Sequence, residues 1–404
     1  MTAFRMGERR TSLIGAVLAA LGPISMAMYT PAMPELVRTF GTTNSAIKMS
    51  LSLYFGGFAL AQLVSGPMSD AFGRRKATIA FLGIYLAGSL AAAYAPTVEW
   101  LLAGRLIQGI GASVGITVSR AIVRDQFVGV EAARIMNMIG IMLAIGPAMA
   151  PTIGGLALAA FGWQSVFFLM VGFGMLACGS VALFMLETAV PDRRRAKPRY
   201  LLGAYLELIC DSRFVSTSLV IAGAVGALYT QATMLPFILI GKVGLTPTQF
   251  GMGMLMQSGS YFLGSVMLRY VARRLAGESC VRLGLTLVGL GAAMVALSVQ
   301  LLEPSFLSIM LPVAVATMGI AFVTPHMTTS GLFPFPHIAG SAAALMGFIQ
   351  MGAGFLGGVI AALIGKPLLA FGTVIPGMGL ISILGYIWYV RCIRRSAMLI
   401  TERS

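Results

Sequence analysis

The sequence predicts an all-α polytopic membrane protein with twelve transmembrane helices in two pseudo-symmetric bundles of six. Of the 404 residues, 58% are hydrophobic and only 10% are charged, with a mean hydropathy of +0.89, whereas soluble domains carry about 25% charged residues. Apolar runs recur along the whole chain, each near the ~20 residues that a helix needs to cross a bilayer. One long polar stretch, residues 187–213, divides these runs into six and six.

We expect each apolar run to form one span. The runs cover approximately residues 11–33, 46–66, 76–95, 98–119, 133–158, 163–186, 214–239, 249–268, 281–301, 305–325, 338–364 and 371–390. The predicted organisation is an N-terminal segment 1–10, a first bundle 11–186, a linker 187–213, a second bundle 214–391 and a C-terminal segment 392–404. Pro191 and Pro198 interrupt any continuous helix in the linker, and its mildly amphipathic stretch 201–209 is predicted to lie on the inner membrane surface.

Basic residues predict the orientation of the chain. All but five of the 28 lysines and arginines fall on the side of the spans that carries the N-terminus. The exceptions are Arg38, Lys48, Arg105, Lys242 and Lys366. Because cytoplasmic loops carry an excess of Lys and Arg, both termini are predicted to be cytoplasmic. The net charge of +15 is interpreted as this orientation signal. Nucleic-acid binding is not expected, since no loop is long enough to form a basic domain.

Cysteine usage predicts neither a disulfide nor a metal site. Cys178 lies within a span, while Cys210, Cys280 and Cys392 lie at or near the predicted cytoplasmic face, where thiols stay reduced. Their spacing fits no metal site. No nucleophile–base pair or phosphate-binding loop indicates an enzyme, and no cofactor is predicted.

The loop after the second apolar run carries the stretch "GPMSDAFGRRK", residues 66–76. Its glycines permit close packing and a turn, and its acid can neutralise a helix end. The arginines lie at the predicted inner face, within reach of an acid in "RAIVRDQF" after the fourth run. We interpret the stretch as an inner gate. The predicted gate residues here are Gly66, Asp70, Gly73, Arg74, Arg75 and Asp125.

Two further stretches place glycine and proline inside apolar runs. They are "RLIQGIGAS" in the fourth run and "GPAMAPTIGG" in the fifth. Small residues let membrane helices approach closely, and proline is tolerated where neighbours satisfy the freed backbone groups. A gating role is predicted for Gly146, Pro147, Gly154 and Gly155.

Together these three stretches resemble the major facilitator superfamily. "SMAMYTPAMP", residues 25–34, also resembles the "STDMYLPALP" segment of its Bcr/CflA-type drug exporters, and the resemblance covers nearly the whole chain. It implies a monomeric multidrug exporter of the bacterial inner membrane, which works as a proton antiporter by rocking two six-helix halves around a central cavity.

The chain departs from that family pattern at Ala27, where the resemblance implies an acid that binds the proton or a cationic drug. All thirteen Asp and Glu residues are predicted to lie in loops or at span ends. Proton coupling therefore stays open. The remaining candidates for a titrating group are Glu35 at the outer mouth of the first span and His326 near the inner end of the tenth. Histidine titrates near neutral pH.

Arg105 is the one arginine predicted in the interior of a span, away from its ends, and a charge there is costly. The expected acceptors are Tyr29, Gln108 and main-chain carbonyls near Pro31 or Pro147. Two interpretations stay open, a structural arginine satisfied by these groups and an arginine that contacts substrate from the cavity. Five guanidinium donors suit neutral polar or anionic substrates.

Uncharged polar, aromatic and thioether side chains at mid-span are predicted to line the cavity, because buried amides are costly without a role and Met accommodates varied ligands. The predicted substrate-binding set is Met28, Tyr29, Tyr54, Arg105, Gln108, Tyr229, Gln231, Gln257 and Gln350. Two functions remain, a drug exporter and a specific metabolite or natural-product exporter or facilitator without proton coupling.

Overall fold

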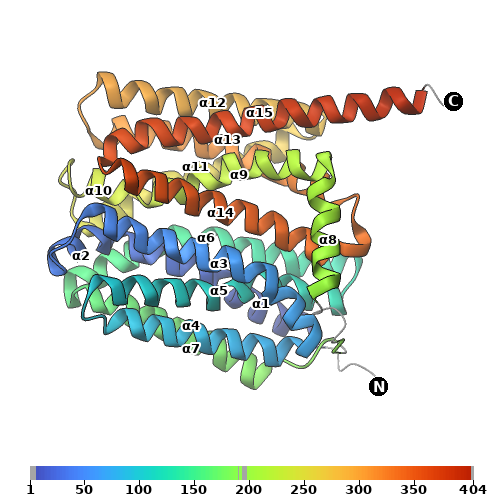
Figure 1. Cartoon of the computed structure of the whole chain (residues 1–404), viewed down its shortest axis with the longest axis horizontal. Helices are drawn as coiled ribbons and strands as arrows, with labels where there is room; N and C mark the ends of the chain where they lie inside the picture. The colour runs from blue at the N-terminus through green and yellow to red at the C-terminus, as the bar shows by residue number, and fades with distance from the viewer. Residues whose placement is uncertain (1–5, 190, 193–197, 402–404) are drawn as a thin grey trace. The chain divides into compact units, whose positions relative to one another are not determined.

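The computed structural model describes residues 6–189, 191–192 and 198–401, and every regular element in them is helical (Figure 1). The first part of the chain forms α1 (Glu8–Tyr29), η1 (Thr30–Ala32), α2 (Met33–Thr39), α3 (Asn44–Phe72), α4 (Arg74–Ala93), α5 (Val98–Gln126), α6 (Gly129–Phe161) and α7 (Trp163–Phe184). The second forms α8 (Pro198–Cys210), α9 (Ser212–Ala232), α10 (Leu235–Leu239), α11 (Pro247–Val271), α12 (Gly277–Leu301), α13 (Phe306–Leu332), η3 (Pro336–Ile338), α14 (Ala339–Ile364) and α15 (Pro367–Thr401).

Eleven helical segments in the described residues are long and apolar enough to cross a bilayer. They correspond to eleven of the twelve predicted spans. The remaining predicted span, residues 249–268, lies within α11, which has 25 residues but is less apolar. The predicted all-α polytopic fold is therefore confirmed.

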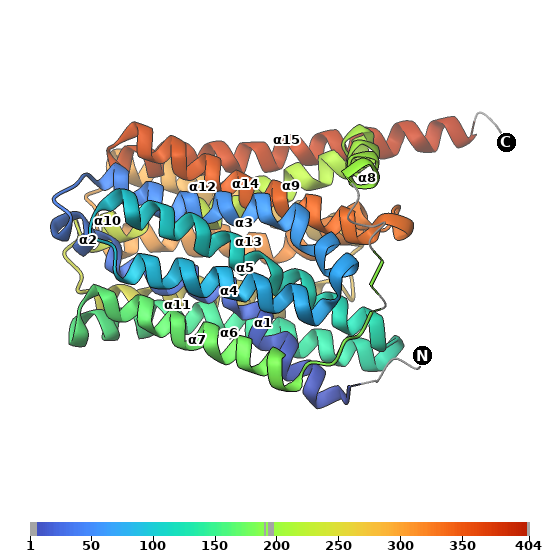
Figure 2. The same ribbon diagram turned by 60° about the horizontal axis from the view of Figure 1, so that its bottom comes forward.

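Proline and the helix ends change some predicted boundaries. The first span is interrupted near its C-terminal end, where Pro31 lies in η1 and Pro34 follows at the start of α2. At the other end of the chain, α15 continues as one helix to Thr401, beyond the predicted end of the last bundle at residue 391 (Figure 2). The linker arginines at positions 193–195 lie outside the described residues.

The chain forms two compact units. The first contains Met1–Leu201 and Leu235–Leu255, and the second contains Leu202–Met234 and Met256–Ser404. Residues 235–255, which the sequence assigns to the second bundle, thus pack with the first unit.

Glycine explains why residues 235–255 pack there. A Cβ added to Gly251 would lie 2.5 Å from the main-chain oxygen of Pro151, and one added to Gly155 would lie 2.5 Å from that of Pro247. Both distances are too short for real atoms, so side chains at these two positions would separate α6 from α11. The close approach of these helices therefore requires glycine.

The linker helix α8 crosses the direction of α9 (Figure 1). It buries Ala204 and Leu208 and exposes three apolar side chains on another face. These are Leu202, Leu206 and Ile209. The Glu207 carboxylate lies 3.0 Å from Nε2 of His337 in η3. An exposed apolar stripe of this kind is typical of a helix that lies on a membrane surface.

Helix α5 packs tightly against α1, α3 and α4 in the first unit. Two glycines permit the closest approaches, since a Cβ on Gly109 would collide with the main-chain oxygen of Tyr54 and one on Gly111 would collide with the main-chain nitrogen of Tyr85. Because main-chain atoms cannot rotate away, only glycine fits there. These contacts fix the distance between α5 and the two tyrosine-bearing helices.

We expect Gly109→Ala to destabilise the first unit, because overpacking a tight contact costs about 1–3 kcal/mol. Gly83→Ala is the matched control, since Gly83 is exposed in α4 and its Cβ would meet no atom within 4 Å. That control should be neutral or stabilising by roughly 0.5–1 kcal/mol. The measurement is thermal unfolding in detergent, and equal melting temperatures for the two variants would contradict the packing argument.

Candidate functional site

The Arg105 side chain is fully enclosed in the first unit, with 0% of its surface exposed. Its guanidinium carbon lies 4.3 Å from the centroid of the Tyr29 ring and 4.4 Å from that of the Tyr54 ring. Both distances fall within the range of cation–π attraction, which reaches about 2 kcal/mol or more for desolvated pairs. Two aromatic faces from α1 and α3 therefore surround the charge that α5 carries.

A chain of hydrogen bonds holds Gln108 beside Arg105. Nη1 of Arg105 donates to Oε1 of Gln108, and Nε2 of Gln108 donates to Oγ of Ser89 at 2.7 Å. Ser89 in turn donates to the carbonyl of Tyr85 at 2.7 Å. Ser89 and Tyr85 are members of this network that sequence reasoning missed. Their spacing on α4 was the available signal, since residues four apart share a helix face.

Hydrogen bonds also fix the two tyrosines. The hydroxyl groups of Tyr29 and Ser50 lie 2.6 Å apart, and the hydroxyl of Tyr54 donates to the carbonyl of Gly22 at 2.9 Å. Tyr29 thus meets Arg105 with its ring face, whereas the sequence interpretation treated Tyr29 as an acceptor for the guanidinium. The hydroxyl is already engaged by α3. With both hydroxyl groups engaged, each ring is held with its face against the guanidinium.

The Arg105 guanidinium retains donor capacity. Its Nε and Nη2 atoms are buried and meet no acceptor among the described residues. Buried donors without partners are costly, at about 1–3 kcal/mol each and more for charged groups. The described residues therefore satisfy the hydrogen-bonding capacity of this arginine only in part. A ligand oxygen that reached Arg105 would accept hydrogen bonds from Nε and Nη2.

Carboxylates are confined to helix ends and connections throughout the described residues, as the sequence predicts. On α5 itself, Glu99 lies in the first turn and Asp125 in the last, while Glu35 lies in the short α2. Ala27 is buried in the last turn of α1. The described part of the chain thus places no acid at the depth of Arg105.

The other predicted substrate-binding residues differ in exposure. In the first unit Met28 is buried, and in the second unit Gln231 is buried with an Nε2 that meets no acceptor in the described chain. The second unit leaves three of them half-buried, namely Tyr229, Gln257 and Gln350. Tyr229 on α9 lies against Gly354 of α14, one turn after Gln350. The structure therefore brings Tyr29, Tyr54 and Gln108 together around Arg105, and it leaves most of the predicted residues of the second unit more exposed.

The predicted inner gate forms an ion-pair cluster around Arg74, which is 2% exposed. Its Nη1 pairs with Asp70, and its Nε donates to Oδ2 of Asp125 at 2.9 Å. Nη1 also donates to Oγ of Ser69 at 2.7 Å. Arg75, in contrast, is exposed and donates to the carbonyl of Ala182. The guanidinium between two acids links the ends of α3, α4 and α5.

Glu187 extends this cluster and was missed by sequence reasoning. Its carboxylate accepts from the main-chain nitrogens of Arg74 at 2.5 Å and Arg75 at 3.2 Å, which lack helical partners at the start of α4. Gly73 has φ +98° and leaves the space that this carboxylate occupies. The position of Glu187 just after the sixth span was the only signal, because nothing local pairs it with α4.

The remaining predicted gate residues mediate close helix contacts. Gly146 lies against the side chain of Ile24, and Gly154 lies against the main-chain carbonyl of Met28. Gly66 faces the methyl group of Thr117. Pro147 lies within α6 between these contacts. The fifth-span stretch therefore packs α6 directly on α1.

The two proton-coupling candidates lie on different elements. Glu35 is half-buried in α2. His326 is half-buried near the C-terminal end of α13, where its imidazole fills the space beside Gly277 at the start of α12. Lys48, which the sequence places only on the outer side, is fully buried on α3 with its Nζ 5.8 Å from the Phe237 ring centroid.

A sequence profile of the Major Facilitator Superfamily matches residues 15–362. The chain belongs to this superfamily. An uncharacterized MFS-type transporter, YdgK, of Bacillus subtilis is 28% identical over 89% of this chain and 90% of its own. The chloramphenicol resistance protein of Pseudomonas aeruginosa is 27% identical over 88% of this chain and 84% of its own. Multidrug resistance protein D of Escherichia coli is 24% identical over 92% and 93%.

Solved structures show the same fold. A bacterial homologue of the human lysosomal transporter Spinster, in an inward-facing and unoccupied conformation, superposes with a TM-score of 0.71 and 14% identity over 95% of this chain and 96% of that one. A D-xylose–proton symporter superposes with a TM-score of 0.71 and 13% identity, over 94% of this chain and 97% of that one. Membership of the superfamily makes this protein a multi-pass membrane transporter for a small molecule, and not an enzyme.

We expect Arg74→Gln to lower stability by roughly 3 kcal/mol, because it leaves two largely buried carboxylates without their partner, and Asp125→Asn to lower it by less, because Arg74 keeps its pair with Asp70. The double variant should lose much less than the sum, since the two groups interact directly. Thermal unfolding in detergent completes this double-mutant cycle. Arg75→Gln, at an exposed neighbour, is the control with a small effect, and additive losses for Arg74 and Asp125 would refute the coupling.

Proposed function

We propose that this transporter exports drugs or related small molecules across the bacterial inner membrane by alternating access, with both termini cytoplasmic, as a monomer. Neutral polar or anionic substrates are preferred over lipophilic cations. The observation that carries the proposal is the enclosed Arg105 guanidinium, which within the described chain keeps two donors without acceptors and has no carboxylate beside it.

Electrostatics supports the substrate preference. A positive charge in a low-dielectric site repels a cation strongly and attracts an anion or the oxygen of a carbonyl, nitro or hydroxyl group. The planar guanidinium also binds such oxygens through two parallel donors. With Ala27 in place of an acid, α1 offers no opposing charge at that position to offset this preference.

Enclosure of Arg105 fits a transporter that binds its substrate in one conformation and hides the site in another. The Arg105 side chain is fully buried beside the rings of Tyr29 and Tyr54, which sit on helices packed against α5, so these helices would have to rearrange before a substrate could reach it. The inner cluster around Arg74 supplies an element that would break and re-form during such a cycle. Names of the relatives support efflux, since they include a chloramphenicol resistance protein and a multidrug resistance protein.

A second candidate is a specific metabolite or natural-product exporter or facilitator without proton coupling. The confinement of acids to helix ends favours it, because the described spans offer no mid-span carboxylate to take up a proton. Glu35 and His326 remain the candidate coupling groups of an antiporter. Both functions share the Arg105 site and differ in the driving force and in the range of substrates.

We expect the chain to protect an efflux-deficient bacterium against uncharged or anionic compounds, such as chloramphenicol, more than against lipophilic cations. Arg105→Ala should abolish protection with normal membrane expression, and Arg105→Lys should also lose most of it because an ammonium lacks the planar fork. Arg273→Ala, at an exposed arginine outside the site, should retain protection. Export by Arg105→Ala at the normal rate would refute the role of the guanidinium, and protection against one compound alone would favour the specific exporter.

Uptake of substrate into everted vesicles should depend only weakly on the pH gradient, because Ala27 replaces the acid that would carry the proton. The measurement compares initial uptake rates with and without a protonophore. Strong collapse of uptake would show that another group titrates during transport. Glu35→Gln and His326→Gln would then identify which one by loss of the gradient dependence.

A further inference from the structure

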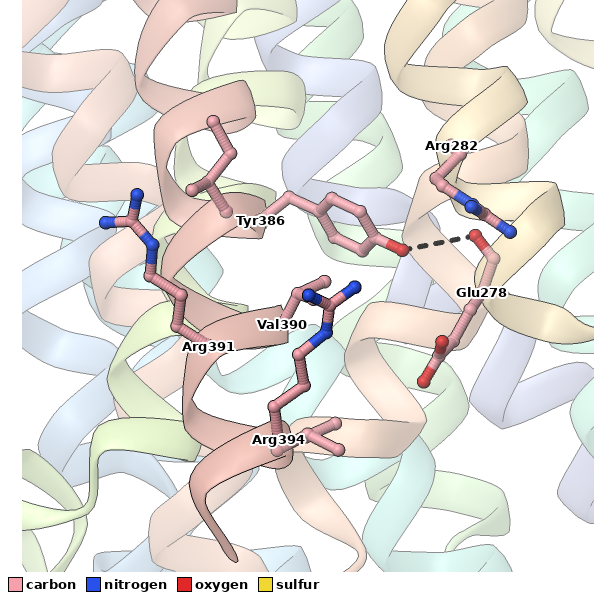
Figure 3. Close-up of a pocket in the computed structure, with 8 residues that line it drawn as sticks. Glu278, Arg282, Tyr386, Val390, Arg391 and Arg394 are labelled. Atoms are coloured by element: carbon pink, nitrogen blue, oxygen red, sulfur yellow. Dashed lines mark hydrogen bonds between the residues drawn. The ribbon is translucent and has the colours of Figure 1, made fainter. Parts of the chain in front are cut away.

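A cationic pocket lies between the start of α12 and the end of α15, at the end of the second unit that carries the C-terminus. It has a volume of about 410 Å³ and is lined by Arg282, Arg391, Arg394, Glu278 and Tyr386 among others. Figure 3 shows Arg394 directed toward the space between the helices, with Arg282 and Glu278 on the α12 side. Three guanidinium groups and one carboxylate leave this pocket with an excess of positive charge.

The charges in the pocket are available to a ligand. Arg282 donates to Oγ of Ser279 at 2.9 Å through one nitrogen, while the described residues provide no ion-pair partner for Arg391 or Arg394. The hydroxyl of Tyr386 donates to the main-chain oxygen of Glu278 at 3.2 Å and joins the two helices beside the pocket (Figure 3). The walls are therefore tied together, while the guanidinium groups keep donors for a ligand.

The face of α15 that leads to the pocket is apolar and exposed. Leu380, Leu384 and Ile387 are 55%, 54% and 41% exposed, and the same heptad spacing continues to Arg391 and Arg394. On one helix face, three side chains suited to hydrocarbon are thus followed by two cations. From residue 380 to residue 391 the helix rises about 16 Å, roughly half the hydrocarbon thickness of a bilayer.

Helix α12 repeats this arrangement in the opposite direction. Arg282 lies near its start, and the exposed Leu290 and Leu297 follow along the span. Both helices therefore present apolar surface that faces lipid in a membrane protein, and both place arginine where that surface ends. Basic pockets between transmembrane helices at this depth bind anionic lipid head groups.

We propose that this pocket binds the head group of an anionic phosphoglyceride with hydroxyl groups, of the phosphatidylglycerol class, from the leaflet on the side of the C-terminus. The phosphate diester is held by Arg282 and Arg394, and Arg391 adds positive charge at its edge. Head-group hydroxyls donate to the Glu278 carboxylate, while the acyl chains lie along Leu380, Leu384 and Ile387. The lining residues belong to the second unit and include none of the residues around Arg105, so the proposal does not depend on the proposed substrate.

The test uses Trp388, which is 39% exposed on α15 beside Ile387. The chain has three tryptophans, so Trp100→Phe and Trp163→Phe leave Trp388 as the reporter in the purified full-length protein. Lipids with brominated acyl chains quench a neighbouring tryptophan. Brominated phosphatidylglycerol should bind about tenfold more tightly than brominated phosphatidylcholine, and added inorganic phosphate should not displace it.

Charge-matched variants decide where the lipid binds. The double variant Arg282→Gln with Arg394→Gln should reduce the preference for phosphatidylglycerol over phosphatidylcholine to within about twofold. The control is Arg273→Gln with Arg274→Gln, which removes the same charge from the turn before α12 and should keep this preference. Glu278→Gln keeps an oxygen that accepts from the head-group hydroxyls and removes a negative charge near the phosphate, so phosphatidylglycerol should bind equally or more tightly. As a second measurement on the chain with all its tryptophans, phosphatidylglycerol should raise the melting temperature, and the Arg282/Arg394 variant should lose this shift.

Four results would overturn the proposal. Equal quenching by brominated phosphatidylglycerol and brominated phosphatidylcholine would show that there is no selective site. An equal loss of the phosphatidylglycerol preference in the two double arginine variants would show that the lipid is attracted by general surface charge. Displacement by inorganic phosphate would make the site one for a free anion. Stronger binding of phosphatidylethanolamine, lost in Glu278→Gln, would assign the pocket to a zwitterionic lipid.

Discussion

A guanidinium held between two tyrosine rings organises the interior of the first unit. Removing a charge from water costs several kcal/mol, and here Tyr29, Tyr54 and Gln108 supply the compensation that a carboxylate usually gives. The compensation is incomplete, since two donors of Arg105 meet no acceptor in the described chain. A buried guanidinium with unpaired donors is suited to ligand binding, because a ligand can supply the missing hydrogen-bond acceptors.

Backbone contacts at glycine make that arrangement possible. Gly109 brings α5 onto the main chain of Tyr54, and Gly111 brings it onto that of Tyr85. The same device recurs where Gly251 meets the Pro151 main chain, so residues 235–255 pack with the first unit. Lipid offers helices little hydrophobic drive to associate, and close van der Waals contact therefore determines which helices stay together.

Charge is handled differently at the helix ends. Around Arg74, Asp70 and Asp125 pair with the guanidinium. Glu187 accepts hydrogen bonds from the main chain at the start of α4, so the cluster satisfies both the charge and the helix end. Around Arg282 and Arg394, the described residues that line the pocket include one acid, Glu278, and the guanidinium groups stand beside apolar helix faces. The first arrangement is suited to a gate made by the protein itself, and the second to contact with the surrounding membrane.

Hydropathy and motif spacing were enough to predict the fold class, the family and the confinement of acids to helix ends, because these are local properties of the chain. They also identified Arg105 and placed Gln108 beside it, since residues three apart share a helix face. The folded chain was needed to show that Tyr29 offers its ring rather than its hydroxyl, that Glu187 caps α4, and that residues 235–255 pack with the first unit. These contacts join residues far apart along the chain, and their geometry depends on how closely glycine allows helices to approach, which no local pattern specifies.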